Sequence, residues 1–400
     1  MAYSILKFNC CQVMKQADFR KRVPTSVRLE PLFLQARFFF EKKGLTTHWQ
    51  WVYCASMVGV ASKQRHAGID ALRLLSMLMV CVLHVSICTR VSPFLNALSC
   101  IAVNLFALIT GYVCVQSSWK IKRYISLWMQ VSFYSVLLFA TGRVLWHCGM
   151  VDEYQPGVKD CLLPVPLAGG YWYFTAYTGL FMVMPFINRL VLSLEKRRYQ
   201  ALLLLAVGAI SLLTVLRHTP ELYERGYNMA WLMALYLVGA YFKLHPARCG
   251  AKLCLAVYLL CSMVIWGLYY VDGIGFPIFD YATPTSLVSS CALFILFARW
   301  QTVPPRLSDS LSRWAPFAFG VYLIQNHPFV WHWFMKGGKA FSQTGCCGWW
   351  MIVPGALVLF AVCLLLDKFR GCLFGWLKVN QWAERLAAKC PARLRDLEKM

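Results

Sequence analysis

Long apolar segments separated by short polar connections dominate the chain, a pattern typical of proteins that cross a membrane many times. A transmembrane helix needs about 20 mainly apolar residues, and several windows reach that length while others are shorter or interrupted. The pattern predicts ten spans, at 69–88, 95–116, 124–146, 172–192, 201–216, 228–242, 253–271, 286–300, 314–334 and 349–366. We therefore expect an all-α polytopic membrane protein with about ten transmembrane helices.

Lysine and arginine gather in alternate connections of this pattern. They fill 120–123, 196–198, 243–252 and 299–313, together with a tail that begins at 368, whereas the intervening connections hold fewer basic residues mixed with acidic ones. Positively charged loops of membrane proteins stay on the cytoplasmic side. Both termini are therefore expected to be cytoplasmic.

The composition agrees with a membrane protein and excludes an ordinary soluble globular protein. Hydrophobic residues make up 59% of the chain and charged residues only 14%, which is far from an ordinary soluble domain. The formal net charge of +23 is expected to meet the anionic headgroups of the lipid bilayer. No nucleic-acid partner is needed to explain it. The cysteines follow no zinc-binding spacing, so no metal is expected.

The chain divides into a membrane domain and two basic flanks. Residues 1–66 form a basic N-terminal extension without a span, 67–367 form the ten-helix domain, and 368–400 form a basic cytoplasmic tail. The extension is either a flexible cytoplasmic segment or sequence upstream of the true start. We favour the second, because Met57 opens a short basic leader directly before the first span, as in bacterial inner-membrane proteins.

Two polar residues stand in the first span, within "DALRLLSMLMVCVLH" at 70–84. Arg73 lies close enough to its cytoplasmic end to reach the headgroups or to pair with Asp70, whereas His84 lies deep in the span. Eleven residues of α-helix end about 20 degrees past three full turns, so Arg73 and His84 share one face, about 16 Å apart. That face suits a ligand with an anionic end at the cytoplasm and a reactive end inside the bundle, as in acetyl-coenzyme A.

Arg73 and His84, separated by ten residues, resemble the Arg-x10-His signature of acyltransferase family 3, a family of integral-membrane O-acyltransferases. Further segments resemble the family's later motifs in order: "AVNLFALITGYV" at 102–113, "SSWKIKRYISLW" at 117–128, "GGYWYFTAYTGLFMVMPFIN" at 169–188 and "FGVYLIQNHPFV" at 319–330. The resemblance covers nearly all of the membrane part. It implies transfer of an acetyl group from acetyl-coenzyme A to a sugar hydroxyl.

The resemblance also implies roles for individual residues. His84 and Arg73 would be the catalytic residues, His84 as the general base, and Arg73 would also bind coenzyme A. Asp70, Lys122 and Arg123 would be further donor-binding residues. The expected substrate-binding side chains are Asn104, Tyr112, Trp172, Tyr173 and His327. For Asn104 and Tyr112 a helix-packing role is the competing interpretation, and for Trp172 and Tyr173 a membrane-interface role.

Two positions depart from the family pattern. Gln325 stands where the late motif usually has histidine, and His327 does not replace it simply, because two residues of helix turn through about 200 degrees. Tyr171 stands where many relatives begin the "WYF" motif with histidine.

The motifs look most like the branch that modifies surface polysaccharides, including lipopolysaccharide. The expected acceptor is a cell-surface polysaccharide or its lipid-linked precursor, at a bacterial inner membrane. Two other classes remain open. One is a transporter or flippase for a lipid-linked sugar, which would show many intramembrane charges or inverted repeats. The other is a structural membrane subunit in which Arg73 and His84 are incidental.

Overall fold

A computed structural model describes residues 66–89, 92–151, 157–162, 164, 170–216, 226–270, 280–300, 302–343 and 348–399. All of them belong to the second of two compact units, Arg65–Met400. The first unit, Met1–Gln64, lies outside the described residues, and so does the expected start at Met57.

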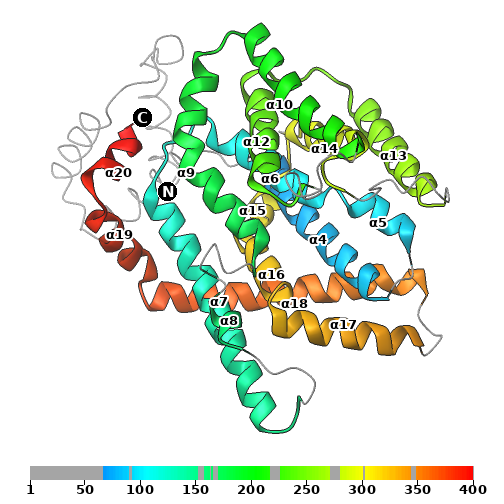
Figure 1. Ribbon diagram of the computed structural model, residues 1–400, viewed down its shortest axis with the longest axis vertical. Coiled ribbons are helices and arrows are strands. Elements are labelled where there is room, and N and C mark those ends of the chain that lie inside the picture. Colours follow the sequence, from blue (N-terminus) through cyan, green and yellow to red (C-terminus); the bar gives the residue numbers. More distant parts are fainter. Residues whose placement is uncertain are drawn as a thin grey trace, which may run out of the picture. The chain divides into compact units, whose positions relative to one another are not determined.

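The described residues form helices and contain no strand, which confirms the all-α fold (Figure 1). The helices are α4 (Ala67–Thr89), α5 (Pro93–Ser99), α6 (Ala102–Cys114), α7 (Ile121–His147), α8 (Val158–Cys161), α9 (Trp172–Ser193), α10 (Lys196–Leu216), α12 (Met229–Leu244), α13 (Ala251–Leu268), α14 (Pro284–Ala298), α15 (Pro305–Trp314), α16 (Ala318–Gln325), α17 (Pro328–Gln343), α18 (Trp349–Trp376), α19 (Val379–Lys389) and α20 (Ala392–Asp396), with 3₁₀ turns η3 (Ala315–Phe317) and η4 (Leu397–Lys399).

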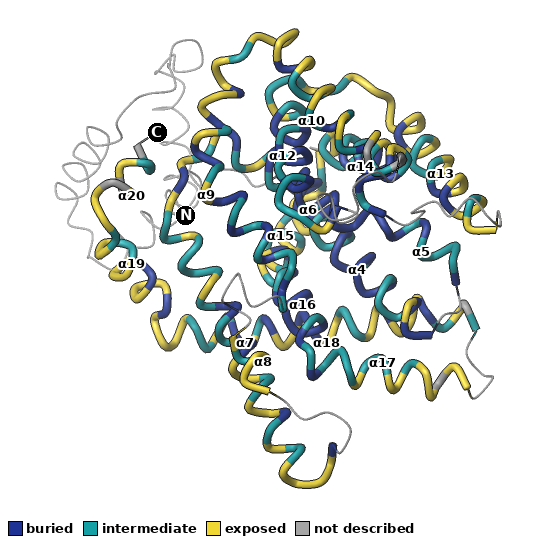
Figure 2. The backbone as a smooth tube through the Cα atoms, viewed as in Figure 1, coloured by how far each residue is buried: buried dark blue, intermediate teal, exposed yellow. Residues whose placement is uncertain are grey.

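Six segments in this part of the chain are long and apolar enough to cross a membrane. They are Ala67–Thr89, Pro93–Cys114, Ile121–His147, Trp172–Ser193, Ala251–Leu268 and Trp350–Trp376, and Met229–Leu244 and Pro284–Ala298 are shorter apolar helices. Figure 2 shows exposed residues along α10, α13 and α18, and many of them are large and apolar. Together with the long apolar helices, they identify a polytopic membrane protein.

The segment expected to form the ninth span, 314–334, is not one continuous helix. It is divided among η3, α16 and α17, and the backbone leaves the helical path at Asn326 and His327. Pro328 explains the break, because proline has no N–H to donate and disfavours helical geometry in the residue before it. As a result, Gln325 is the last residue of α16.

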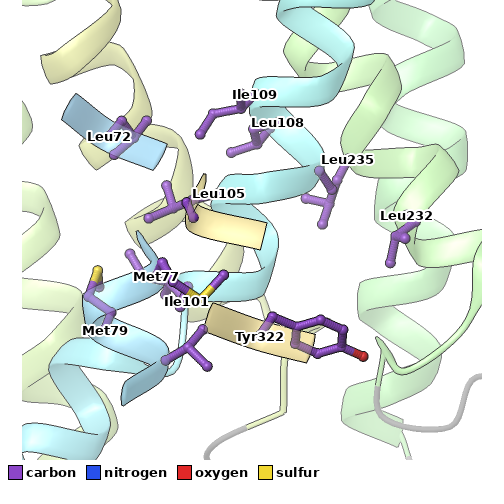
Figure 3. Close-up of a cluster of buried hydrophobic side chains, with 14 of the residues drawn as sticks. Leu72, Met77, Met79, Ile101, Leu105, Leu108, Ile109, Leu232, Leu235 and Tyr322 are labelled. Carbon is purple, nitrogen blue, oxygen red and sulfur yellow. The ribbon is translucent and has the colours of Figure 1, made fainter. Parts of the chain in front are cut away.

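Helix α4 lies at the centre of the unit and packs against α5, α6, α14, α16, α17 and α18. Figure 3 shows Leu72 of α4 beside Leu105, Leu108 and Ile109 of α6. Glycines allow α6 and α12 to pack closely, because a Cβ on Gly111 or Gly239 would lie 2.0 or 2.1 Å from a backbone oxygen of the other helix. The contacts of α4 with its six neighbouring helices fix the position of α4, which carries Arg73 and His84.

Candidate active site

His84 of α4 is held by Gln325 at the end of α16. The His84 Nδ1 and Gln325 Oε1 atoms are 2.9 Å apart, and Gln325 Nε2 donates a hydrogen bond to Cys81 Sγ at 3.0 Å. Since an amide oxygen only accepts hydrogen bonds, His84 Nδ1 carries the proton in this pair. The other ring nitrogen, Nε2, therefore has its lone pair available.

A cavity of about 250 Å³ adjoins the His84 ring. Trp331 of α17 meets this ring edge to face, with the ring centroids 4.9 Å apart. Aromatic side chains dominate the lining of the cavity: Phe106, Trp172, Tyr173, Tyr227, Tyr281, Phe319, Tyr322 and Trp331. The structure thus brings three of the residues named in the sequence prediction, His84, Trp172 and Tyr173, to one cavity.

Hydrogen bonds between α9 and α16 fix this aromatic wall. The Tyr173 backbone N–H donates to the Tyr322 hydroxyl at 3.3 Å, and the Tyr171 hydroxyl donates to the Leu323 carbonyl at 2.8 Å. Trp172 stacks on Tyr281 with centroids 6.1 Å apart and planes 17° apart. The tyrosine at position 171 therefore contributes an interhelical bond at the start of α9.

Asn104 and His327 lie behind this site and are absent from the cavity lining. Fully buried Asn104 donates to the Tyr281 carbonyl at 2.8 Å and accepts from Trp231 Nε1 at 3.0 Å. His327 is also fully buried, and its Nδ1 accepts from the Phe329 backbone N–H at 3.3 Å. Asn104 thus supports the cavity wall, and His327 supports the first turn of α17.

A group of cationic side chains lies at the other end of α4. Arg73 Nη1 donates to the buried carboxylate of Asp70 at 3.2 Å, and 30% of the Arg73 side chain is exposed. Arg123 of α7 donates to Ser117 Oγ at 3.4 Å, and both guanidinium groups lie close enough to the Cys114 thiol to interact electrostatically with it. The cations of this basic end therefore come from α4 and α7, and the last residue of α6, Cys114, lies within reach of their charge.

Lys243 of α12 extends the basic end, although the sequence prediction did not include it. Its ammonium group lies 4.8 Å from the centroid of the Tyr112 ring, which in turn meets His66 edge to face at 6.0 Å. Burial lowers the pKa of His66 below its ordinary value, and the nearby charge of Lys243 acts in the same direction. The sequence feature that could have identified Lys243 is its position in the last turn of a short apolar helix. Tyr112 thus belongs to the basic end.

Lys122 makes a different contact from its neighbour Arg123. Its ammonium group forms an ion pair with Glu384 of α19. One residue earlier, the Ile121 backbone N–H at the start of α7 donates to Glu398 at 3.1 Å. Two carboxylates of the C-terminal segment therefore bind the first turn of α7.

A buried ionic cluster joins α7, α16 and α18, and the sequence prediction missed it. Asp367 is fully buried and accepts hydrogen bonds from Gln130 at 3.1 Å, Tyr134 at 2.9 Å and Arg370 at 2.6 and 2.9 Å. A Cβ on Gly320 of α16 would lie 2.1 Å from Asp367 Cγ. The cluster therefore fixes α16, whose last residue is Gln325. Within the described residues, no group of three His, Cys, Asp or Glu side chains is placed to hold a metal ion.

Comparison with known proteins gives one match. A family model described as an acyltransferase domain, that of acyltransferase family 3, matches residues 66–368. No curated protein and no solved structure matches the chain. The match covers more than half of the chain and includes both the cavity at His84 and the basic end of α4.

Proposed function

Because the chain belongs to acyltransferase family 3 and is an integral-membrane acyltransferase, we propose that it moves an acetyl group from acetyl-coenzyme A to a hydroxyl of a cell-surface polysaccharide or its lipid-linked precursor. The observation that carries this proposal is the His84–Gln325 hydrogen bond beside an aromatic cavity. It supports a general base whose basic nitrogen is available to an acceptor hydroxyl.

His84 acts first as base and then as acid. Nε2 takes the proton of the acceptor hydroxyl while the hydroxyl oxygen forms a bond to the acetyl carbonyl carbon. The carbon–sulfur bond of the thioester breaks, and the sulfur leaves with its electron pair and regains a proton from Nε2. Gln325 accepts from Nδ1–H throughout and stabilises the transient imidazolium. Such proton transfer typically contributes about 10² to 10⁴ in rate.

The basic end of α4 suits the donor. A guanidinium group binds phosphate oxygens through two parallel donors, and Arg73, Arg123 and Lys243 bring three cations to one region. His84 lies about 16 Å further along α4, which leaves room for an extended arm between phosphate and thioester. In this proposal Asp70 positions Arg73, and Lys122 contributes when a phosphate displaces Glu384.

The aromatic cavity suits the acceptor. Apolar faces of sugar rings pack on aromatic side chains, so Trp172 and Tyr173 are proposed to bind the sugar next to His84. Asn104 and His327 take part by holding the wall and α17 in place. The basic end faces the cytoplasm of a bacterial inner membrane, with both termini on that side.

The test of this function is a gene deletion followed by NMR of the surface glycans. We expect O-acetyl signals to disappear on deletion, to return with the wild-type chain, and to remain absent with His84→Ala. Unchanged O-acetyl signals in the deletion strain would overturn the polysaccharide acceptor. Failure of the purified protein to consume acetyl-coenzyme A with any glycan fraction of that strain would overturn the donor.

A further inference from the structure

A second cavity, of about 570 Å³, lies between α4, α17 and α18. We call it the lateral groove and define it by its lining: Val85, Cys88, Thr89, Trp333, Phe334, Gly337, Gly338, Trp350, Met351, Ile352, Pro354, Gly355 and Val358. The lining is almost entirely apolar. Trp350 and Val358, at its rim, are 60% and 64% exposed, so the groove opens to the side of the bundle. In a membrane protein this side faces hydrocarbon.

The lateral groove lies next to the cavity at His84, because neighbouring residues of the same two helices, α4 and α17, line the two cavities. His84 and Trp331 line the first cavity, and Val85 and Phe334 line the groove. The Trp331 and Phe334 rings are neighbours on α17, with centroids 6.5 Å apart. A molecule that occupies both cavities would therefore lie next to His84, the candidate base, because residues that line the two cavities are less than one helical turn apart on α4 and on α17.

Two glycines keep the groove open. A Cβ on Gly337 would meet no atom within 4 Å, and a Cβ on Gly355 would meet only Val85 Cγ1, at 3.9 Å. Neither position needs glycine for close packing of helices. Gly338 is different, because its Cβ would lie 2.6 Å from the Cβ of Cys88. The space at Gly337 and Gly355 is therefore a feature of the groove rather than a consequence of helix contact.

We propose that the lateral groove binds the hydrocarbon chain of a lipid-linked acceptor whose hydroxyl-bearing head lies in the cavity at His84. This inference rests on the proposed function and selects the lipid-linked acceptor over the free polysaccharide. A chain already in the bilayer gains little free energy by entering an apolar groove, since lipid and groove are equally apolar. Binding of the hydrocarbon chain in the groove instead favours the reaction by orientation, because it holds the head group beside His84 in a reactive position.

Photo-crosslinking of the full chain in lipid nanodiscs tests the groove without requiring activity. The probe is a long-chain alkyl glycoside with a diazirine on its alkyl chain, and labelled peptides are located by mass spectrometry. We expect labelling in α17 and α18 that excess unlabelled long-chain glycoside displaces. A methyl glycoside of the same sugar and added disc phospholipid should not displace it.

Filling the groove should remove the label. Gly355→Leu and Gly337→Leu should each lower labelling by about tenfold, whereas the matched control Gly355→Ala, whose Cβ fits, should label like wild type. Labelling that both leucine variants leave unchanged, or that phospholipid displaces as well as the glycoside does, would overturn the proposal.

His84→Ala should retain labelling. If the wild type is labelled in the groove but transfers no acetyl group, the proposed function is overturned and the groove proposal is not. If it transfers acetyl groups without specific labelling, the groove proposal is overturned and the proposed function is not.

Discussion

His84 Nδ1 and Gln325 Oε1 are 2.9 Å apart although the two residues are 241 positions apart in the chain. In the arrangement that the structure gives, the Gln325 amide donates from Nε2 to Cys81 Sγ and directs Oε1 at His84, which places the ring proton on Nδ1. This one relationship gives His84 the tautomer that a base facing the cavity needs.

Gln325→Leu should therefore impair turnover. Leucine keeps the approximate size of the side chain and removes the acceptor for Nδ1–H, so we expect kcat to fall by about tenfold to a hundredfold, less than the full contribution of a general base. The KM for acetyl-coenzyme A should stay near the wild-type value. Steady-state kinetics in nanodiscs checks both values, and Gln325→His, which restores the usual family residue, should recover part of kcat. Wild-type kcat in Gln325→Leu would show that the contact does not serve catalysis.

Arg73→Lys should weaken donor binding. The charge remains but the planar pair of donors is lost, so we expect KM for acetyl-coenzyme A to rise by about fivefold to tenfold with a smaller change in kcat. Lys122→Gln is the matched control, because Lys122 is already paired with Glu384, and its KM should rise less. An equal rise in both variants would contradict the assignment of the donor to the Arg73 region.

The basic and acidic connections should lie on opposite sides of the membrane. We expect reporter fusions after Gln155 and after Gln200 to report opposite compartments, with the second in the cytoplasm, because lysine and arginine cluster at 196–198. Cysteine accessibility at the same positions provides an independent measurement. If both fusions report the same side, the helix between them, α9, does not cross the membrane.

Asp367→Asn should destabilise the protein. It leaves the Arg370 guanidinium buried without its counter-charge, and breaking a buried pair in this way typically costs about 3 to 5 kcal/mol. We expect a clear fall in Tm, measured by thermal unfolding in detergent. The double variant Asp367→Asn/Arg370→Gln removes both charges and should recover part of the loss. A Tm of Asp367→Asn equal to that of the wild type would mean that the ion pair contributes nothing to stability.

Sequence reasoning succeeded where the relevant information is local. Arg73 and His84 are eleven positions apart on one helix, so helical geometry alone places them on one face of α4. Most of the apolar runs likewise predicted a helix to within a few residues, whereas the runs at 95–116 and 314–334 are each divided between helices.

Contacts between distant segments were beyond that reasoning. Nothing in the periodicity of α4 indicates that Gln325 binds His84, because this contact depends on how α4 and α16 pack. The hydropathy pattern ended the last span at 366, since Asp367 and Arg370 look like the start of a polar tail, yet α18 continues to Trp376 with both charges buried. The break before Pro328 had a sequence signal, but the surrounding apolar run masked it.

The most direct measurement compares His84→Ala with wild type in the transfer of labelled acetyl groups from acetyl-coenzyme A to the glycan fraction of isolated membranes. At equal protein abundance, we expect His84→Ala to lower the rate by about 10² to 10⁴, without rescue by more acetyl-coenzyme A. The matched control His147→Ala, which alters an exposed histidine at the end of α7, should retain the wild-type rate. A wild-type rate in His84→Ala would contradict the role of His84 as general base and make it a packing residue.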